Sequence, residues 1–342
     1  MSLLKISHLH KSFSGVKAVN DISITLEKGK ILAILGESGS GKTTLLHLIA
    51  ALYEPDSGTL LLDNERITPP SEKLIAGHPD IKLVRQDYGL FPNMSIRENI
   101  AYELRYYEEG YRNGRVDKLL EISGLAHVQH HVPRQVSGGE QQRATIVKAI
   151  AEEPKLLLLD EPFSHLDAVN KRRLKTEVLK LIKAEEVSCI FVTHDVTDAY
   201  GMADELLIMQ NGNALQLGSP EEIYRNPINQ YVAEITGETC LSSELGVLSS
   251  EFNNHTKSLN EPYKSLSTQH RTADRSALST FLRPEQIRVS EKSDIRATVL
   301  SVKFLGAYDE VLLQVDDVKL KMYSFDRLSV GDKIGIEIKT LS

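Results

Sequence analysis

A glycine-rich loop constrains the fold of this chain more than any other feature of its sequence. Residues 36–44 read Gly-Glu-Ser-Gly-Ser-Gly-Lys-Thr-Thr and fit the pattern G-x-x-x-x-G-K-S/T. The apolar residues 31–35 before the loop predict a buried strand, and residues 43–50 after it predict a helix. Glycines let backbone N–H groups turn towards an anion, and a helix N-terminus attracts one. This arrangement therefore predicts a cradle for the phosphates of a nucleoside triphosphate.

Two side chains of the loop suit the chemistry of a bound triphosphate. The Lys42 ammonium would reach the β- and γ-phosphates, and the Thr43 hydroxyl would bind Mg²⁺. The alternative is a flexible Gly/Ser turn without a ligand, although such a turn does not require a strand before it and a helix after it. The predicted nucleotide-binding residues of the loop are Gly36, Glu37, Ser38, Gly39, Ser40, Gly41, Lys42, Thr43 and Thr44.

Composition narrows the kinds of partner that this chain can have. Its 342 residues indicate two domains, or one large domain with an appendage, and its formal net charge of −7 argues against nucleic acid as the main partner. The two cysteines, Cys189 and Cys240, form no disulfide framework and fit a reducing compartment. We expect no signal peptide, and no apolar run approaches the roughly 18 residues that cross a bilayer. A function at a membrane would therefore work through a partner protein.

Strand-like and helix-like runs alternate along most of the chain, which predicts an α/β domain with a partly parallel sheet. Residues 3–35 have the pattern of strands that lead into the loop, and residues 211–213, Asn-Gly-Asn, predict a hairpin turn. The further predicted strands cover residues 59–62, 81–84, 156–159, 188–193 and 205–209. The predicted helices cover residues 95–107, 115–122, 138–152, 169–185 and 195–202.

The composition changes after residue 237, where a second part of the chain is expected to begin. Residues 238–280 are rich in Ser, Thr, Asn and Glu and predict a linker or surface segment with room for one short strand. These patterns predict a domain at 1–237, an irregular segment at 238–280 and a small all-β, barrel-like domain at 281–342. The predicted strands of the last domain cover residues 287–289, 296–304, 310–315, 318–323 and 333–339.

Two carboxylates follow the apolar residues 156–159. At the carboxyl end of a strand in an α/β sheet, such groups face the ligand crevice. We expect Asp160 to hold Mg²⁺, directly or through water, and Glu161 to polarise the water that attacks the γ-phosphate. The alternative is an acidic turn after a core strand, which the nearby phosphate loop makes the weaker interpretation.

A second anion-binding helix start is predicted at residues 136–143, which read Val-Ser-Gly-Gly-Glu-Gln-Gln-Arg. Ser137 followed by Glu140 is a capping-box pattern. A well-capped helix and nothing more is the alternative, but Gly138 and Gly139 would each cost such a helix roughly 1 kcal/mol relative to alanine. Glycines there permit close approach of an anion to the helix N-terminus. Because the chain already has one phosphate loop, this second site suggests a second molecule.

Together these motifs resemble those of ABC-type ATPases. Residues 137–141 are similar to the signature motif of that family, residues 36–44 to its Walker A motif and residues 160–161 to its Walker B motif. The resemblance covers roughly residues 3–236 and involves six motifs in the family's order. It implies a P-loop NTPase fold with an antiparallel β subdomain and a helical subdomain, followed here by the small all-β domain. It also implies ATP and Mg²⁺ as cofactors.

Smaller matches complete the resemblance. Residues 164–167 resemble the D-loop, Gln86 the Q-loop glutamine, His194 the switch histidine and Phe13 the aromatic residue that stacks on adenine, with Val16 close by. Taken alone, Gln86 could be an exposed polar residue, His194 a structural histidine and Phe13 a core residue. Positions that depart from the family's usual residues, without removing a catalytic group, are Arg85, Asp87, Val136 and His165.

The resemblance implies a head-to-tail dimer with two ATP molecules at its interface. Each ATP would lie between Lys42 of one copy and the helix start at residues 137–140 of the other. The residues implied in catalysis are Lys42, Gln86, Glu161 and His194, and those implied in Mg²⁺ binding are Thr43, Gln86 and Asp160. The nucleotide-binding residues of the second half-site are Ser137, Gly138, Gly139 and Glu140.

A transport motor and a soluble ATPase acting on nucleic acid or ribosomes are the two classes to separate. The stretch between the loop and the signature is too short for the long coiled coil of DNA-repair members, and the chain has one cassette rather than two. The transport motor is favoured, at the cytoplasmic face of the cell membrane. Its expected partners are a second copy, integral membrane permease subunits that dock on residues 87–99, and an external solute-binding protein, with no nucleic acid.

Residues 281–287, Phe-Leu-Arg-Pro-Glu-Gln-Ile, resemble the start of the accessory OB-like domain, the TOBE domain, of importer ATPases. Residues 302–308 and the turn at 330–332 fit that domain, and an unrelated β appendage is the alternative. Such importers carry sugars, polyamines, ferric iron, sulfate, molybdate or phosphonates. We expect a ferric-iron-like or polyamine-like importer, although the ATPase need not touch the solute.

Overall fold

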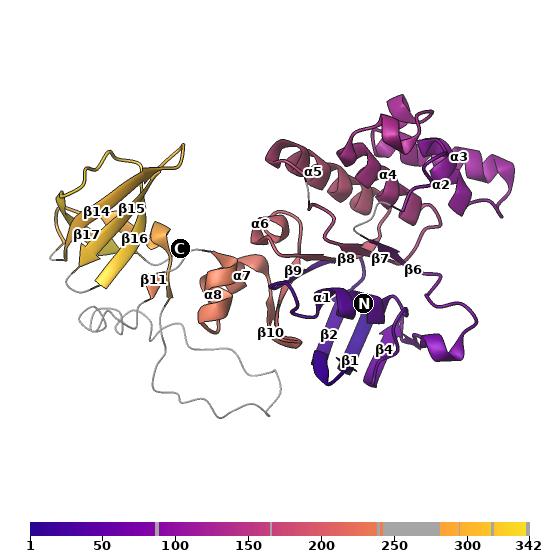
Figure 1. The fold of residues 1–342 in the computed structure, drawn as a ribbon, viewed down its shortest axis with the longest axis horizontal. Coiled ribbons are helices and arrows are strands. Elements are labelled where there is room, and N and C mark those ends of the chain that lie inside the picture. Colours follow the sequence, from indigo (N-terminus) through magenta and orange to yellow (C-terminus); the bar gives the residue numbers. More distant parts are fainter. Residues whose placement is uncertain are drawn as a thin grey trace. The chain divides into compact units, whose positions relative to one another are not determined.

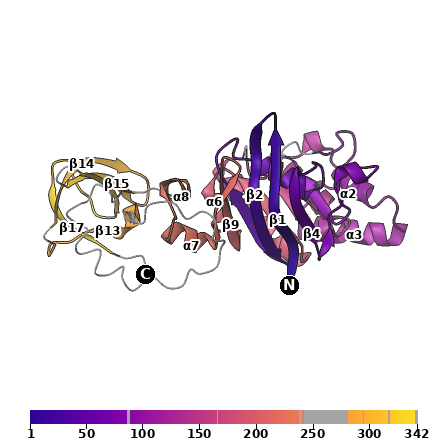
Figure 2. The ribbon, with the colours of Figure 1, turned by 90° about the horizontal axis from the view of Figure 1, so that it is seen from below.

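The computed structural model describes residues 1–85, 89–164, 166–237, 240–241, 281–293, 295–315 and 318–339. The chain divides into two compact units, Met1–Ile223 and Tyr224–Ser342. Figure 1 and Figure 2 show these units from two directions. Within the described residues, none of the helices is long and apolar enough to cross a membrane.

A mainly parallel sheet forms the centre of the first unit (Figure 1). Its strand order is β10-β9-β3-β8-β7-β6, in which β10 runs antiparallel to β9 and the other neighbours are parallel. All residues of β3 and β8 are buried, as expected of parallel strands that are covered on both faces. The predicted hairpin at residues 211–213 joins β9 to β10. The strands are β3 (Ile31–Leu35), β6 (Ile81–Val84), β7 (Leu156–Asp160), β8 (Ser188–Thr193), β9 (Glu205–Gln210) and β10 (Asn213–Gly218).

An antiparallel sheet of strand order β2-β1-β4-β5 shares its core with one face of the central sheet. Alternate residues of β2 are buried, including Ile22, Ile24 and Leu26, because one face of this sheet packs inwards. Helix α1 (Lys42–Ile49) adds its leucines to the same core. The predicted α/β fold with an antiparallel β subdomain is therefore confirmed. The strands are β1 (Ser2–Phe13), β2 (Val16–Glu27), β4 (Ser57–Leu62) and β5 (Glu65–Arg66).

A group of helices covers the other face of the central sheet, opposite α1 (Figure 1). The predicted helix at 115–122 begins earlier, because Gly110 and Gly114 interrupt the apolar pattern of its first turns without ending the helix. The helix expected at 195–202 is shorter than predicted. These helices are α2 (Ile96–Glu103), α3 (Glu109–Ile122), α4 (Gly138–Ile150), α5 (Ala168–Ala184) and α6 (Val196–Ala199), and α7 (Pro220–Arg225) and α8 (Gln230–Thr236) follow β10.

The second unit contains the predicted all-β part of the chain. Its sheet has the strand order β13-β17-β14-β15-β16, and every neighbouring pair is antiparallel. A separate short pair joins β11 (Cys240–Leu241) to β12 (Phe281–Leu282). Residues 242–280 lie outside the described residues, and the domain limits at 237 and 280 stay a prediction. The sheet strands are β13 (Ile287–Val289), β14 (Arg296–Phe304), β15 (Asp309–Val315), β16 (Val318–Ser324) and β17 (Lys333–Ile338).

A buried arginine joins α8 to the start of the β-module inside the second unit. The Arg283 side chain is 2% exposed, and its guanidinium donates hydrogen bonds to the carbonyl oxygens of Ala233 at 2.7 Å and Tyr224 at 2.9 Å. It also donates to the Thr236 hydroxyl at 2.9 Å and lies 4.2 Å from the centre of the Tyr224 ring. The planar, five-donor guanidinium suits several acceptors at fixed positions.

Replacing this arginine should loosen the second unit. We expect Arg283→Met to lower its free energy of unfolding by about 2–3 kcal/mol, because buried carbonyl oxygens lose their donor. Hydrogen exchange of peptides covering β14 and β15 in the full chain measures the effect. The matched control is Arg288→Met, at an exposed position of β13, which should leave exchange unchanged. Equal protection in both variants would contradict the structural role of Arg283.

Candidate functional site

The glycine-rich loop lies between β3 and α1, as the sequence predicted. Gly41 caps α1 with a φ of 100°, in the left-handed region that favours glycine. A Cβ atom on Gly41 would lie 2.0 Å from the carbonyl oxygen of Ala18, and one on Gly36 would lie 2.4 Å from that of Met209. These contacts leave no room for a side chain at either position. Glycine is thus required by the close packing of the loop against neighbouring backbone.

Lys42 is buried and points into the loop. Its Nζ atom donates to the carbonyl oxygens of Gly36 at 2.8 Å and Glu37 at 2.7 Å. Burial lowers the pKa of Lys42, while the negative charges of Glu161 and Asp160 act in the opposite direction. Carbonyl dipoles hold the ammonium in place without cancelling its charge, so the arrangement can attract a phosphate.

Thr43 and Asp160 meet where α1 begins and β7 ends. The Thr43 hydroxyl donates to Asp160 Oδ1 at 3.1 Å. Burial raises the pKa of Asp160, and the hydrogen bond from Thr43 partly offsets that effect. A hydroxyl and a partly buried carboxylate are hard oxygen donors, and Mg²⁺ in nucleotide sites is commonly held by one or two such side chains together with phosphates. The residues present therefore fit a magnesium ion.

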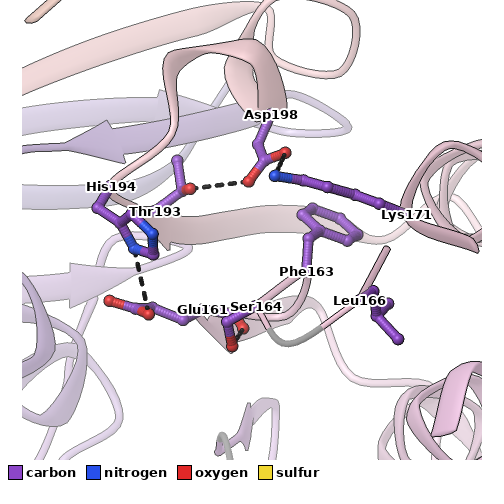
Figure 3. Close-up of a pocket in the computed structure, with 8 residues that line it drawn as sticks. All are labelled: Glu161, Phe163, Ser164, Leu166, Lys171, Thr193, His194 and Asp198. Atoms are coloured by element: carbon purple, nitrogen blue, oxygen red, sulfur yellow. Dashed lines mark hydrogen bonds and ion pairs between the residues drawn. The ribbon is translucent and has the colours of Figure 1, made fainter. Parts of the chain in front are cut away.

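Glu161 and His194 face each other beside this pair, at the ends of β7 and β8 (Figure 3). His194 Nδ1 lies 3.3 Å from Glu161 Oε2, and both line a cavity of about 280 Å³. Glu161 has a φ of 47°, an uncommon conformation for a residue with a side chain. Its backbone N–H donates to the carbonyl oxygen of Val192 at 3.2 Å. Such strain is tolerated where the surroundings fix the backbone, and it is frequent at functional sites.

The loop that carries His194 is held by charged groups. Asp195 caps α6 by accepting from the Thr197 N–H at 2.9 Å, and it lies 2.6 Å from Lys171 Nζ on α5. Partial burial alone would raise the pKa of Asp195. The hydrogen bonds from Lys171 and Thr197 outweigh this effect and lower the pKa to about 2. The carboxylate is therefore ionised over the whole physiological range.

The predicted capping box at the second helix start is confirmed. Ser137 accepts from the Glu140 N–H at 3.4 Å, and Glu140 Oε2 accepts from the Ser137 N–H at 2.8 Å and from the Ser137 hydroxyl at 2.7 Å. His127 Nε2 lies 3.1 Å from the other oxygen of Glu140. Ser137 is exposed, and a Cβ on Gly139 would meet nothing within 4 Å, so this helix end is open to another molecule.

The remaining predicted residues are distributed as follows. Phe13 is 44% exposed and packs edge-on against Tyr53 at 5.7 Å between ring centres, so it is not a core residue. Ser38 and Gly39 lie at the exposed top of the phosphate loop. Gln86 and His165 lie outside the described residues.

Sequence reasoning missed a groove beside α1. His47 is 7% exposed, and its Nε2 atom has no hydrogen-bond partner in the part of the chain that the structure describes. Burial lowers the pKa of His47, and the positive charge of Arg85 acts in the same direction. With Tyr53, Ile75 and Arg85 it lines a groove of about 640 Å³. A lone histidine in a helical pattern gives no signal for such a groove.

The strand–loop–helix unit, with carboxylates at the end of β7, the second parallel strand from β3, defines a P-loop ATPase. Residues 19–164 match the family model described as ABC transporter. The Fe(3+) ions import ATP-binding protein FbpC 2 of Pectobacterium atrosepticum is 33% identical over 98% of this chain and 97% of that protein. The chain belongs to the ABC transporter family, as an ATP-binding and ATP-hydrolysing subunit.

Two further comparisons each cover about two thirds of the chain. The putrescine transport ATP-binding protein PotG of Escherichia coli is 39% identical over 69% of this chain and 62% of that protein. A solved dimeric structure of the ATP-binding cassette MJ0796 in a post-hydrolysis state, bound to ADP and Pi, has a TM-score of 0.55 and 26% identity. It covers 64% of this chain and 98% of that one.

The ion pair of Asp195 gives stability that depends on pH. Because folding lowers the pKa of Asp195, its ionised carboxylate stabilises the folded state. This stabilisation is complete above the ordinary pKa of 3.8 and is lost as the pH falls through about 2. We expect Asp195→Asn to cost about 1 kcal/mol at pH 7, allowing for solvent screening of a partly exposed pair, and to cost progressively less below about pH 4.

Denaturant unfolding of both proteins between pH 7 and pH 3 measures this difference. The control is Asp117→Asn, whose partner Arg97 lies 2.6 Å away in an exposed ion pair, and which should change stability little. A cost for Asp195→Asn that does not depend on pH would contradict the assignment.

Proposed function

We propose that this chain is the ATP-hydrolysing motor of an import system, in which two copies close head to tail on two ATP molecules and drive separate membrane subunits. The observation that carries the proposal is the pair of separate anion-binding helix starts. The loop before α1 and the open N-terminus of α4 belong to helices on opposite faces of the central sheet (Figure 1). One nucleotide would then use the first site of one copy and the second site of the other.

The residues at the strand ends supply what phosphoryl transfer needs, which is positioning and charge neutralisation more than covalent chemistry. Lys42 binds the β- and γ-phosphates, and Glu161 orients and polarises the attacking water. His194, within 3.3 Å of Glu161, steadies that carboxylate and contacts the γ-phosphate. Thr43, Asp160 and Gln86 would hold Mg²⁺, which when bound neutralises charge on the phosphate oxygens.

The second copy completes the site. Its Ser137 hydroxyl and the N–H groups of Gly138, Gly139 and Glu140 would donate to the γ-phosphate. In the single chain this hydroxyl donates to Glu140 at 2.7 Å, so a phosphate would take over a donor that is already aimed at an anion. The exposed ring of Phe13, supported by Tyr53, is suited to stack on adenine.

The permease would dock on residues 87–99, which include the loop at residues 89–95 and the first turn of α2. The buried Asn99 side chain holds this loop by donating to the carbonyl oxygens of Phe91 at 3.1 Å and Met94 at 3.0 Å and accepting from the Phe91 N–H at 2.7 Å. The groove at His47 lies beside Arg85, just before this segment, and Ile75 at its edge is 83% exposed. Exposed apolar side chains beside an ordered groove suit a helix of a membrane subunit.

Ferric iron is the solute that we favour over a polyamine. The relative named for Fe(3+) matches 98% of this chain, including the C-terminal module, whereas the relative named for putrescine matches 69%. Import also implies an external solute-binding protein and a position of this chain at the cytoplasmic face of the membrane. The C-terminal module would act as the TOBE domain of this importer.

Glu161→Gln should separate ATP binding from hydrolysis. We expect hydrolysis to fall by about 100-fold or more, because the water loses its base, while ATP still promotes dimerisation. Phosphate release and light scattering measure the two effects. Glu186→Gln is the matched control, since Glu186 is an exposed glutamate that also has a positive φ. Normal turnover of Glu161→Gln would contradict the proposed mechanism.

The transport proposal is tested by isolating the chain with its membrane partners. The complex, placed in lipid vesicles with its binding protein, should hydrolyse ATP several times faster with ferric iron than without it. Putrescine should have no effect. Stimulation of ATP hydrolysis by putrescine and not by ferric iron would show that a polyamine is the solute. Stimulation by ribosomes or DNA, with no membrane partner recovered, would favour a soluble ABC ATPase.

A further inference from the structure

We propose that Lys171 on α5 is a positioning residue that fixes the loop carrying His194 and links it to the start of α5. This inference rests on the proposed function, because it assigns His194 to the γ-phosphate end of the site. Within the part of the chain that the structure describes, the ion pairs of Lys171 are with Asp195 and Asp198 and involve neither the phosphate loop nor Glu161. Lys171 would therefore position His194 indirectly, through the carboxylates of Asp195 and Asp198.

The first link is Asp198 on α6. Its side chain is 2% exposed, with Oδ1 2.8 Å from Lys171 Nζ and Oδ2 accepting from the Thr193 hydroxyl at 2.9 Å (Figure 3). Thr193 immediately precedes His194. The lysine thus holds the residue on one side of the histidine through a single buried carboxylate.

The second link is Asp195, on the other side of His194. Its Oδ2 atom lies 2.6 Å from Lys171 Nζ, and its backbone N–H donates to the Thr193 hydroxyl at 3.0 Å. The neighbours of His194 are therefore tied to each other and to the same ammonium group. A rotation of this loop would separate the buried carboxylate of Asp198 from the Lys171 ammonium, which is unfavourable.

The cluster also shares a cavity with the reacting groups. Lys171, Asp198 and Thr193 line the same space of about 280 Å³ as Glu161 and His194 (Figure 3). Apolar side chains could pack such a place with similar stability, since buried ion pairs contribute little net stability. The directional contacts of these ion pairs and hydrogen bonds instead specify one geometry. We infer that the geometry specified here is that of His194.

Lys171 lies one helical turn from the start of α5. Asp167 caps this helix by accepting from the N–H groups of Val169 and Asn170, both at 3.1 Å, and its carbonyl oxygen accepts from the Lys171 N–H at 2.8 Å. Leu166 and Asp167 belong to the segment that resembles the D-loop. A second copy pressing on this segment would therefore displace Lys171 and, with it, the His194 loop.

Lys175 provides a matched control on the same face of α5. Its Nζ atom also lies 2.8 Å from Asp198 Oδ1, but its other bond is to the carbonyl oxygen of Thr197 at 2.7 Å, and it has no ion pair with Asp195. Both lysines thus pair with the same buried carboxylate. Lys171 differs in holding both sides of His194.

The test compares Lys171→Met, Lys171→Arg and Lys175→Met in the full chain by steady-state ATP hydrolysis. We expect Lys171→Met to lower kcat by about 10-fold or more with KM for ATP within about 2-fold, because His194 is misplaced while phosphate binding is unchanged. Lys171→Arg should retain most activity, and Lys175→Met should keep kcat within about 2-fold. Equal losses of kcat in the two methionine variants would show a merely structural role and overturn the proposal, as would a normal kcat for Lys171→Met.

Glu161→Gln separates this proposal from the function on which it rests. If Glu161→Gln is inactive and Lys171→Met is fully active, the positioning role alone fails. If Glu161→Gln hydrolyses ATP normally, the proposed mechanism itself fails. ATP-driven dimerisation of the double variant Glu161→Gln, Lys171→Met should match that of Glu161→Gln. Loss of that dimerisation would place Lys171 in nucleotide binding and also overturn the proposal.

Discussion

The parallel pairing of β3, β8 and β7 is the constraint on which the site depends. Leu35 pairs with Thr193, and Val192 pairs with Asp160, so the three strands end at one edge of the sheet. The residues that come next are the phosphate loop, His194 and Glu161. A slip of one residue would turn the side chains of a whole strand to the opposite face. Register therefore brings groups from three distant parts of the chain to one place.

Two buried or partly buried lysines at this edge of the sheet, Lys42 and Lys171, have opposite kinds of partner. Carbonyl oxygens hold Lys42, so its positive charge remains available to a phosphate. Around His194 the ammonium groups of Lys171 and Lys175 are instead matched by Asp195 and Asp198, so little net charge remains. The first arrangement favours binding of an anion, and the second favours a fixed position. The same residue type thus serves recognition at one place and alignment at the other.

Features encoded by neighbouring residues were predictable from the sequence. The loop before α1, the capping box at Ser137 and the alternation of strands and helices each depend on a few consecutive positions. The ion pair of Lys171 with Asp195 and the buried hydrogen bonds of Arg283 join residues far apart in the chain. No local sequence pattern predicts these contacts. The start of α3 was missed because Gly110 and Gly114 weaken its pattern, while packing of the later turns sustains the helix.

The two helix starts explain why a single copy would be incomplete. The sheet between α1 and α4 keeps the phosphate loop and Ser137 on separate elements of one compact unit, and local rearrangement of a loop would not bring them together. A twofold dimer solves this geometric problem, because each copy offers both halves and symmetry uses each half once. Closure on ATP would then press one copy against the start of α5 in the other. The route from that contact to His194 passes through Lys171, so the step that completes the site would also align it.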